Sequence, residues 1–81
     1  MDENTKMARA YLKGLTTKAE FNAIVDRLFI SETEKVILIG IYAENKSMSL
    51  LADELGYSMQ TVKNLHRKIL CKVSHLVYNR M

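Results

Sequence analysis

The sequence lacks proline and tryptophan, and it holds only three glycines and one cysteine among 81 residues. The absence of proline removes the strongest helix breaker and favours a helical chain. A single cysteine excludes an internal disulfide framework, so we expect Cys71 to be reduced and the protein to be cytoplasmic. The longest apolar run, residues 36–43, is far shorter than the roughly 20 residues that span a bilayer. No membrane partner is therefore expected.

Hydrophobic residues make up 48% of the chain, which is too apolar for a disordered tail and suits one small domain over residues 1–81. A domain of this size seldom assembles a buried catalytic cleft. The sequence also has no nucleophile motif and no glycine-rich phosphate loop. We therefore expect no enzymatic activity and no cofactor. The acidic start of the chain, Met-Asp-Glu-Asn, lacks a signal-peptide pattern, so export is not expected.

The two histidines and the cysteine do not predict a metal site. His66 and Cys71 are five residues apart, which places them on different faces of a helix. Cys71 and His75 share a face, but no third or fourth ligand recurs nearby. We interpret Cys71 as a partly buried, small apolar residue.

Positive charge is concentrated at one end of the chain. Residues 58–81 contain five lysines and arginines and no acidic residue, whereas residues 1–34 contain five basic and six acidic residues. A basic end of this kind is attracted to phosphate, to anionic lipid or to acidic proteins.

Capping signals predict an all-α bundle of four or five helices. Thr17–Glu20 and Ser31–Glu34 are capping boxes, in which a hydroxyl residue precedes a glutamate by three positions. Thr5, Ser47 and Ser58 are the expected N-caps of the other helices. The five expected segments are residues 5–13, 17–29, 31–43, 47–55 and 58–78.

Apolar spacing indicates how these segments pack. Phe21 to Phe29 repeat apolar residues at helical intervals, and the helices within residues 5–29 are expected to complete the core. In the third segment, seven apolar residues surround Gly40, which predicts a central helix with a close crossing at the glycine. Asn45 is a plausible left-handed residue in the connection that follows.

Residues 47–70, SMSLLADELGYSMQTVKNLHRKIL, have the pattern of a helix-turn-helix. Ala52 is small where two helices would cross closely, and Gly56 can adopt the positive φ that the turn requires. Ser58 can cap the second helix. The residues expected to fill the angle between the helices are Leu51, Leu55, Tyr57, Val62 and Leu65.

The second helix of this unit presents a polar and basic face. Gln60, Lys63 or Asn64, and Arg67 recur at intervals of three and four residues, so they lie on one side. Asparagine and glutamine can pair with adenine through two hydrogen bonds, and lysine and arginine can pair with guanine. Solvation alone would also account for polar side chains here, but the turn chemistry and the basic charge favour a DNA-reading helix.

The sequence from Ile30-Ser-Glu-Thr-Glu34 through SLLADELGYSMQTVKNLHRKIL resembles region 4 of bacterial RNA polymerase sigma factors, over about residues 30–76. The resemblance implies a DNA-reading helix that carries Met59, Gln60, Thr61, Lys63, Asn64 and Arg67. It also implies RNA polymerase as a partner, because this sigma domain binds the flap of the β subunit.

Two features separate the chain from a complete sigma factor. The chain has no room for the domain that melts the −10 promoter element, which implies a stand-alone regulator of the phage or mobile-element type. Leu50 stands where sigma domains usually have an acidic residue, so we expect it to face outward. The response-regulator helix-turn-helix family shares Thr61-Val-Lys-Asn64, but it would require one residue fewer in the preceding loop.

The expected function is therefore sequence-specific binding of double-stranded DNA for transcription regulation. Phosphate contacts would position the duplex, and base contacts would read it. The residues expected to contact phosphates are His66, Lys68 and Lys72. The residues expected to read bases are Gln60, Lys63, Asn64 and Arg67.

The alternative is a helix-turn-helix protein-interaction module, either an RNA polymerase-binding factor or a phage packaging-type DNA-binding subunit. A single module with about three to five phosphate-contacting cations binds DNA weakly at physiological salt, so a second copy or a protein partner would add affinity. The apolar residues that would form a homodimer seam or a polymerase patch are Leu50, Leu76, Val77 and Tyr78.

Overall fold

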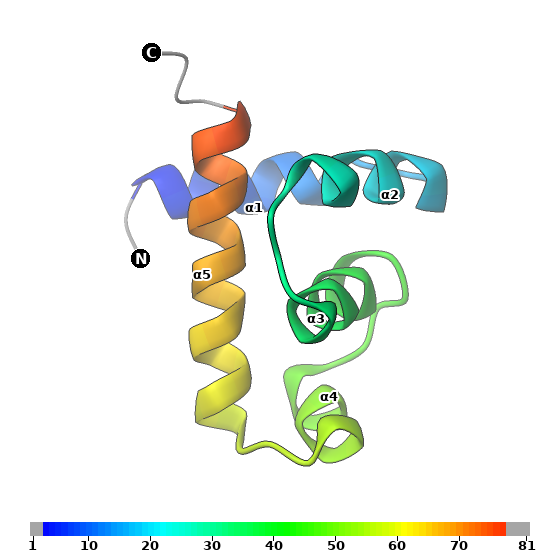
Figure 1. Ribbon diagram of the computed structural model, residues 1–81, viewed down its shortest axis with the longest axis vertical. Helices are drawn as coiled ribbons and strands as arrows, with labels where there is room; N and C mark the ends of the chain where they lie inside the picture. Colours follow the sequence, from blue (N-terminus) through cyan, green and yellow to red (C-terminus); the bar gives the residue numbers. More distant parts are fainter. Residues whose placement is uncertain (1–2, 78–81) are drawn as a thin grey trace.

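The computed structural model describes residues 3–77, with side chains from Thr5 onward, and it is all-α as the sequence predicts. Its five helices in this range are α1 (Glu3–Lys13), α2 (Lys18–Arg27), α3 (Glu32–Tyr42), α4 (Met48–Leu55) and α5 (Met59–Val77). The long α5 packs against α1, α3 and α4, and α1 crosses its C-terminal half (Figure 1). None of these helices is long and apolar enough to cross a membrane.

Both predicted capping boxes are present. The Thr17 hydroxyl accepts a hydrogen bond from the Glu20 amide at 3.2 Å, and the Glu20 carboxylate accepts one from the Thr17 amide at 3.1 Å. Ser31 and Glu34 form the same reciprocal pair at 3.2 and 3.1 Å. Each box satisfies amides that the first turn of a helix leaves without partners, and this fixes where α2 and α3 begin.

Two predicted helix ends are wrong. Helix α1 begins at Glu3 instead of after Thr5, and Thr5 lies buried inside the helix. Helix α2 ends at Arg27, because Leu28 adopts an extended conformation (ψ 137°) and turns its side chain into the core. The chain has then left the helical path, and Phe29 is 95% exposed instead of continuing the apolar stripe. The predicted end of the last helix, Tyr78, lies outside the described residues.

One hydrophobic core joins all five helices. Ala8 and Leu12 of α1 are fully buried against the bundle, so the N-terminal helix belongs to this core. Leu76 and Val77 are partly buried against it. The other core residues are Phe21, Ile24, Val25, Leu28, Ile37, Leu38, Leu51, Ala52, Val62, Ile69, Leu70 and Val73.

The close crossing predicted at Gly40 is confirmed. Gly40 of α3 is buried, and a Cβ atom added there would lie 2.8 Å from Cδ2 of Leu51 in α4. That separation is shorter than the van der Waals contact distance of two carbon atoms. The absence of a side chain at Gly40 therefore allows the close approach of α3 and α4.

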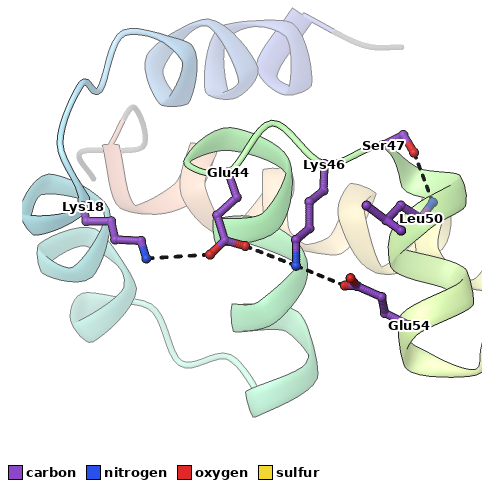
Figure 2. Close-up of polar contacts among 6 residues, drawn as sticks. All are labelled: Lys18, Glu44, Lys46, Ser47, Leu50 and Glu54. Carbon is purple, nitrogen blue, oxygen red and sulfur yellow. Dashed lines mark hydrogen bonds and ion pairs between the residues drawn. The ribbon is translucent and has the colours of Figure 1, made fainter.

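The connection between α3 and α4 is held by its backbone and by a chain of ion pairs. Asn45 adopts the predicted positive φ, 56°, and the amide of Lys46 donates to the carbonyl of Gly40 at 2.8 Å. Figure 2 shows Lys18 of α2, Glu44, Lys46 and Glu54 of α4 in one row. Their successive nitrogen–oxygen distances are 3.7, 3.4 and 3.1 Å. Solvent screens exposed pairs of this kind, so they orient the loop more than they stabilise it.

Ser47 begins α4 as predicted. Its hydroxyl accepts a hydrogen bond from the Leu50 amide at 3.1 Å (Figure 2). The direction in which α4 leaves the loop is thereby fixed, and with it the position of the first helix of the helix-turn-helix.

We expect a bulkier residue at position 40 to destabilise the protein through Leu51. Gly40→Val should lower the free energy of unfolding by about 1–3 kcal/mol, because the added methyl groups overpack the crossing. In the background of Leu51→Ala the same substitution should cost less, because the trimmed side chain leaves room. Urea denaturation of both single variants and the double variant measures this coupling, and additive effects would contradict the crossing.

Candidate nucleic-acid interface

The turn between α4 and α5 has the conformation that a helix-turn-helix requires. Gly56 adopts a left-handed conformation, φ 74° and ψ 26°, and the Tyr57 amide donates to the Ala52 carbonyl at 2.9 Å. A Cβ at Gly56 would meet no neighbouring atom within 4 Å, so the glycine is required by its φ and not by space. Ser58 caps α5 as predicted, with its hydroxyl accepting from the Thr61 amide at 3.1 Å.

The angle between α4 and α5 is filled by aliphatic side chains. Leu51 and Val62 are fully buried and Ala52 is 5% exposed. The prediction that Tyr57 helps to fill this angle is wrong, because its side chain is 43% exposed. Tyr57 follows the left-handed glycine in the turn, and the angle is already closed by smaller side chains.

The base-reading residues predicted from the sequence lie on the exposed side of α5. Gln60, Lys63, Asn64 and Arg67 are all exposed, while Val62 and other residues of the stripe face the core. The Gln60 amide nitrogen donates to the Asn64 amide oxygen at 3.1 Å, which holds the two side chains together. The exposed residues of α5 also include Met59, Thr61 and Lys68.

Three cations of this face are available to a ligand. Lys63, Arg67 and Lys68 form no ion pair with any residue in the described range 5–77. The face therefore combines amide groups that match adenine with positive charges that match guanine or phosphate.

Lys72, which the sequence places among the phosphate contacts, is already engaged within the fold. Its Nζ donates to the carbonyl oxygen of Phe29 at 3.0 Å and lies 3.5 Å from the Glu34 carboxylate. Burial raises the pKa of Glu34, but hydrogen bonds from Ser31 and the charge of Lys72 outweigh it and hold that pKa below its usual value. Much of the Lys72 charge is therefore neutralised by an internal carboxylate.

The predicted position of His66 beside the phosphate backbone is wrong. His66 is only 4% exposed, and its Nε2 lies 2.7 Å from the Tyr42 hydroxyl. Burial and, to a smaller extent, the charge of the nearby Arg9 guanidinium lower the pKa of His66 to about 4, so the ring is neutral at pH 7. Its place could have been found from the sequence, because it lies four residues after Val62 and three before Ile69, on the apolar stripe.

Cys71 is exposed, which corrects the prediction that it is partly buried. The buried stripe of α5 includes Leu70 and Val73, so position 71 turns toward solvent. Within residues 5–77, no group of three histidine, cysteine, aspartate or glutamate side chains is placed to hold a metal ion.

Arg9 is a cation near this interface that the sequence pattern did not single out. It lies on α1, yet it lines the same cleft as Lys63 and Arg67 of α5. Nothing in the local sequence marks Arg9, because its position depends on how α1 crosses α5.

Comparison of the chain with protein-family models, with curated proteins and with solved structures finds no match. The resemblance to sigma region 4 therefore stays a prediction. The features that bear on function are the turn at Gly56, the exposed face of α5 and the cations around that face.

Burial of neutral His66 should make stability depend on pH. The pKa is about 4 in the folded protein against an ordinary value of 6.5, so the unfolded chain binds the proton more readily. The stabilisation that comes from burying neutral His66 is fully present above pH 6.5 and is lost as the pH falls toward 4. Between pH 7 and pH 5 we expect the free energy of unfolding to fall by about 2 kcal/mol.

Chemical denaturation of His66→Gln at both pH values tests this expectation. The amide can still bond to Tyr42 but does not titrate, so most of the pH dependence should vanish. His75→Gln, at an exposed position of the same helix, is the matched control and should keep it. An undiminished pH dependence in His66→Gln would contradict the assignment.

Proposed function

We propose that this protein is a sequence-specific double-stranded DNA-binding regulator of transcription, with α5 in the major groove. The observation that carries the proposal is the capped α4–turn–α5 unit whose second helix exposes Gln60, Lys63, Asn64 and Arg67 on one face. An exposed helix face with these side-chain types is what reading of base edges requires.

Each exposed residue has a specific role in this proposal. Asn64 and Gln60 recognise adenine, and they exchange their mutual hydrogen bond for bonds to the base edge. Lys63 and Arg67 recognise guanine, while Lys68 contacts a phosphate that positions the duplex. Met59 and Thr61 lie in the first turn, where methyl groups can pack against thymine.

The resemblance to sigma region 4 supports a role at promoters and names RNA polymerase as a second partner. It also supports action in a bacterial cytoplasm, as a stand-alone regulator of the phage or mobile-element type. The small number of free cations on α5 supports a further contact, either a second copy of the chain or the polymerase, because few phosphate contacts give weak binding at physiological salt.

The second candidate function is a protein-interaction module, and exposed apolar side chains favour it. Leu50 of α4 is 44% exposed and Tyr57 of the turn is 43% exposed. Large apolar side chains that remain in water beside a helix-turn-helix suit a protein partner better than a phosphate backbone.

Reversing the charge on the reading face, the side of α5 that carries Gln60, Lys63, Asn64 and Arg67, should abolish DNA binding. For Lys63→Glu with Arg67→Glu we expect a loss of at least about 30-fold in affinity, because two contacts are removed and replaced by repulsion. Fluorescence anisotropy on duplexes selected from a random library measures the loss, and circular dichroism should show unchanged helix content.

The control is the double variant Lys18→Glu with Arg27→Glu, which changes net charge equally at two exposed positions on α2. It should retain most of the affinity. Equal losses in the two double variants would mean that binding depends on net charge alone, and the assigned reading face would be wrong.

The interaction-module candidate predicts a different result. Binding to purified bacterial RNA polymerase should survive Lys63→Glu with Arg67→Glu and fail with Leu50→Glu, which places a charge in the apolar contact. Val36→Glu on α3 is the matched control, because Val36 is similarly exposed at 41%. Size-exclusion co-elution distinguishes the outcomes, and binding by Leu50→Glu equal to that of the unaltered chain would eliminate this patch.

A further inference from the structure

A cleft of about 490 Å³ lies between α1, Met48 at the start of α4 and the middle of α5. Arg9 of α1 and Lys63 and Arg67 of α5 line it, and the buried Leu70 contributes to its apolar wall. No acidic side chain of the described residues lines this cleft. Three cations from two helices therefore converge on one concave surface.

No carboxylate among residues 5–77 pairs with the cations around the cleft. Arg9 shares a side-chain hydrogen bond with the Tyr42 hydroxyl, but like Lys63 and Arg67 it forms no ion pair in this range. His66 also lines the cleft. Its ring is neutral at pH 7, and the Arg9 guanidinium would repel the ring if it gained a proton. Like charges held around a cleft repel one another, and a bound anion relieves that repulsion.

The cleft adjoins the face of α5 described above. Lys63 and Arg67 belong both to that face and to the cleft, so an anion in the cleft would lie at the edge of the reading surface. A neighbouring depression is lined by Arg9 and Lys13, one helical turn apart on α1. Positive charge therefore extends from Lys63 and Arg67 of α5 to Arg9 and Lys13 of α1.

We propose that Arg9 binds a backbone phosphate of the duplex that α5 reads, beside the bases that Lys63 and Arg67 contact, so that α1 is a second DNA-contacting element. The inference rests on the proposed function and adds to it a contact outside the helix-turn-helix. A guanidinium group can donate two parallel hydrogen bonds to a phosphate. A phosphate contact adds affinity and fixes the orientation of the duplex without reading its sequence.

The test is Arg9→Gln in the full chain, measured by fluorescence anisotropy on a preferred duplex and a scrambled duplex over a salt series. We expect both affinities to fall by a similar factor, about 3- to 10-fold, and the slope of log K against log salt to become less negative by about 1. The preference between the two duplexes should not change. Arg27→Gln is the matched control, because this exposed arginine of α2 lines a separate depression with Glu20. It should leave the slope unchanged.

A second measurement does not depend on how the variant folds. The Nε–H resonance of Arg9 in the unaltered protein should shift when duplex is added, and that of Arg27 should not. The same resonance is also recorded with inorganic phosphate at equal ionic strength, which tests whether the cleft binds a free anion. A shift with inorganic phosphate and none with duplex would overturn the inference, because the cleft would then bind small anions rather than DNA.

The remaining outcomes separate this inference from the proposed function. Unchanged affinity and slope for Arg9→Gln would overturn the α1 contact while DNA binding by α5 stands. An altered duplex preference with an unchanged slope would also overturn it, because Arg9 would then act by shaping α5. Absence of DNA binding by the unaltered chain at low salt would overturn both.

Discussion

The burial of one stripe of α5 is the constraint on which the rest of the structure depends. Val62, Ile69 and Val73 are fully buried among α1, α3 and α4. Each such side chain contributes about 1.5–3 kcal/mol relative to leaving it in water. Because the stripe fixes how α5 is rotated, it also fixes which residues face outward. The exposed set from Gln60 to Arg67 is a consequence of packing on the opposite side.

Two polar contacts set the register of α5 against α3. Tyr42 at the end of α3 bonds to His66, and Glu34 near its beginning pairs with Lys72. The later residue of α3 thus meets the earlier residue of α5, so the two helices run in opposite senses past each other. A buried polar group without a partner lowers the stability of the protein. A shift of α5 along α3 would separate these two pairs, so they disfavour a register that hydrophobic packing alone would tolerate.

Local features of this fold were readable from the sequence because their causes are local. The capping box at Thr17, the left-handed Asn45 and the turn at Gly56 each depend on a few adjacent residues, and each is confirmed. The close crossing at Gly40 was also predictable, since a glycine amid apolar residues implies a neighbouring helix. The face of α5 followed from helical periodicity, which places residues before any tertiary contact is known.

Features that depend on tertiary contacts could not be read in the same way. Helical spacing alone places His66 on the apolar stripe, but its hydrogen-bond partner, the Tyr42 hydroxyl 24 residues earlier, depends on how α3 packs against α5. Phe29 is exposed because Leu28 breaks the helical path one residue before it, and no capping signal marks that break. Lys72 is paired inside the fold because α3 begins beside it.

The arrangement also bears on how one small domain could bind both DNA and a protein. The DNA-reading residues proposed here belong to α5, whereas Leu50, the apolar side chain proposed for a partner, belongs to α4. The two surfaces use different side chains, so a partner on α4 need not displace DNA from α5. In the proposed function, the small number of free cations on α5 gives a weak DNA contact. A second contact that leaves α5 accessible would then raise occupancy without altering which bases are read, because the proposal places base reading on α5 alone.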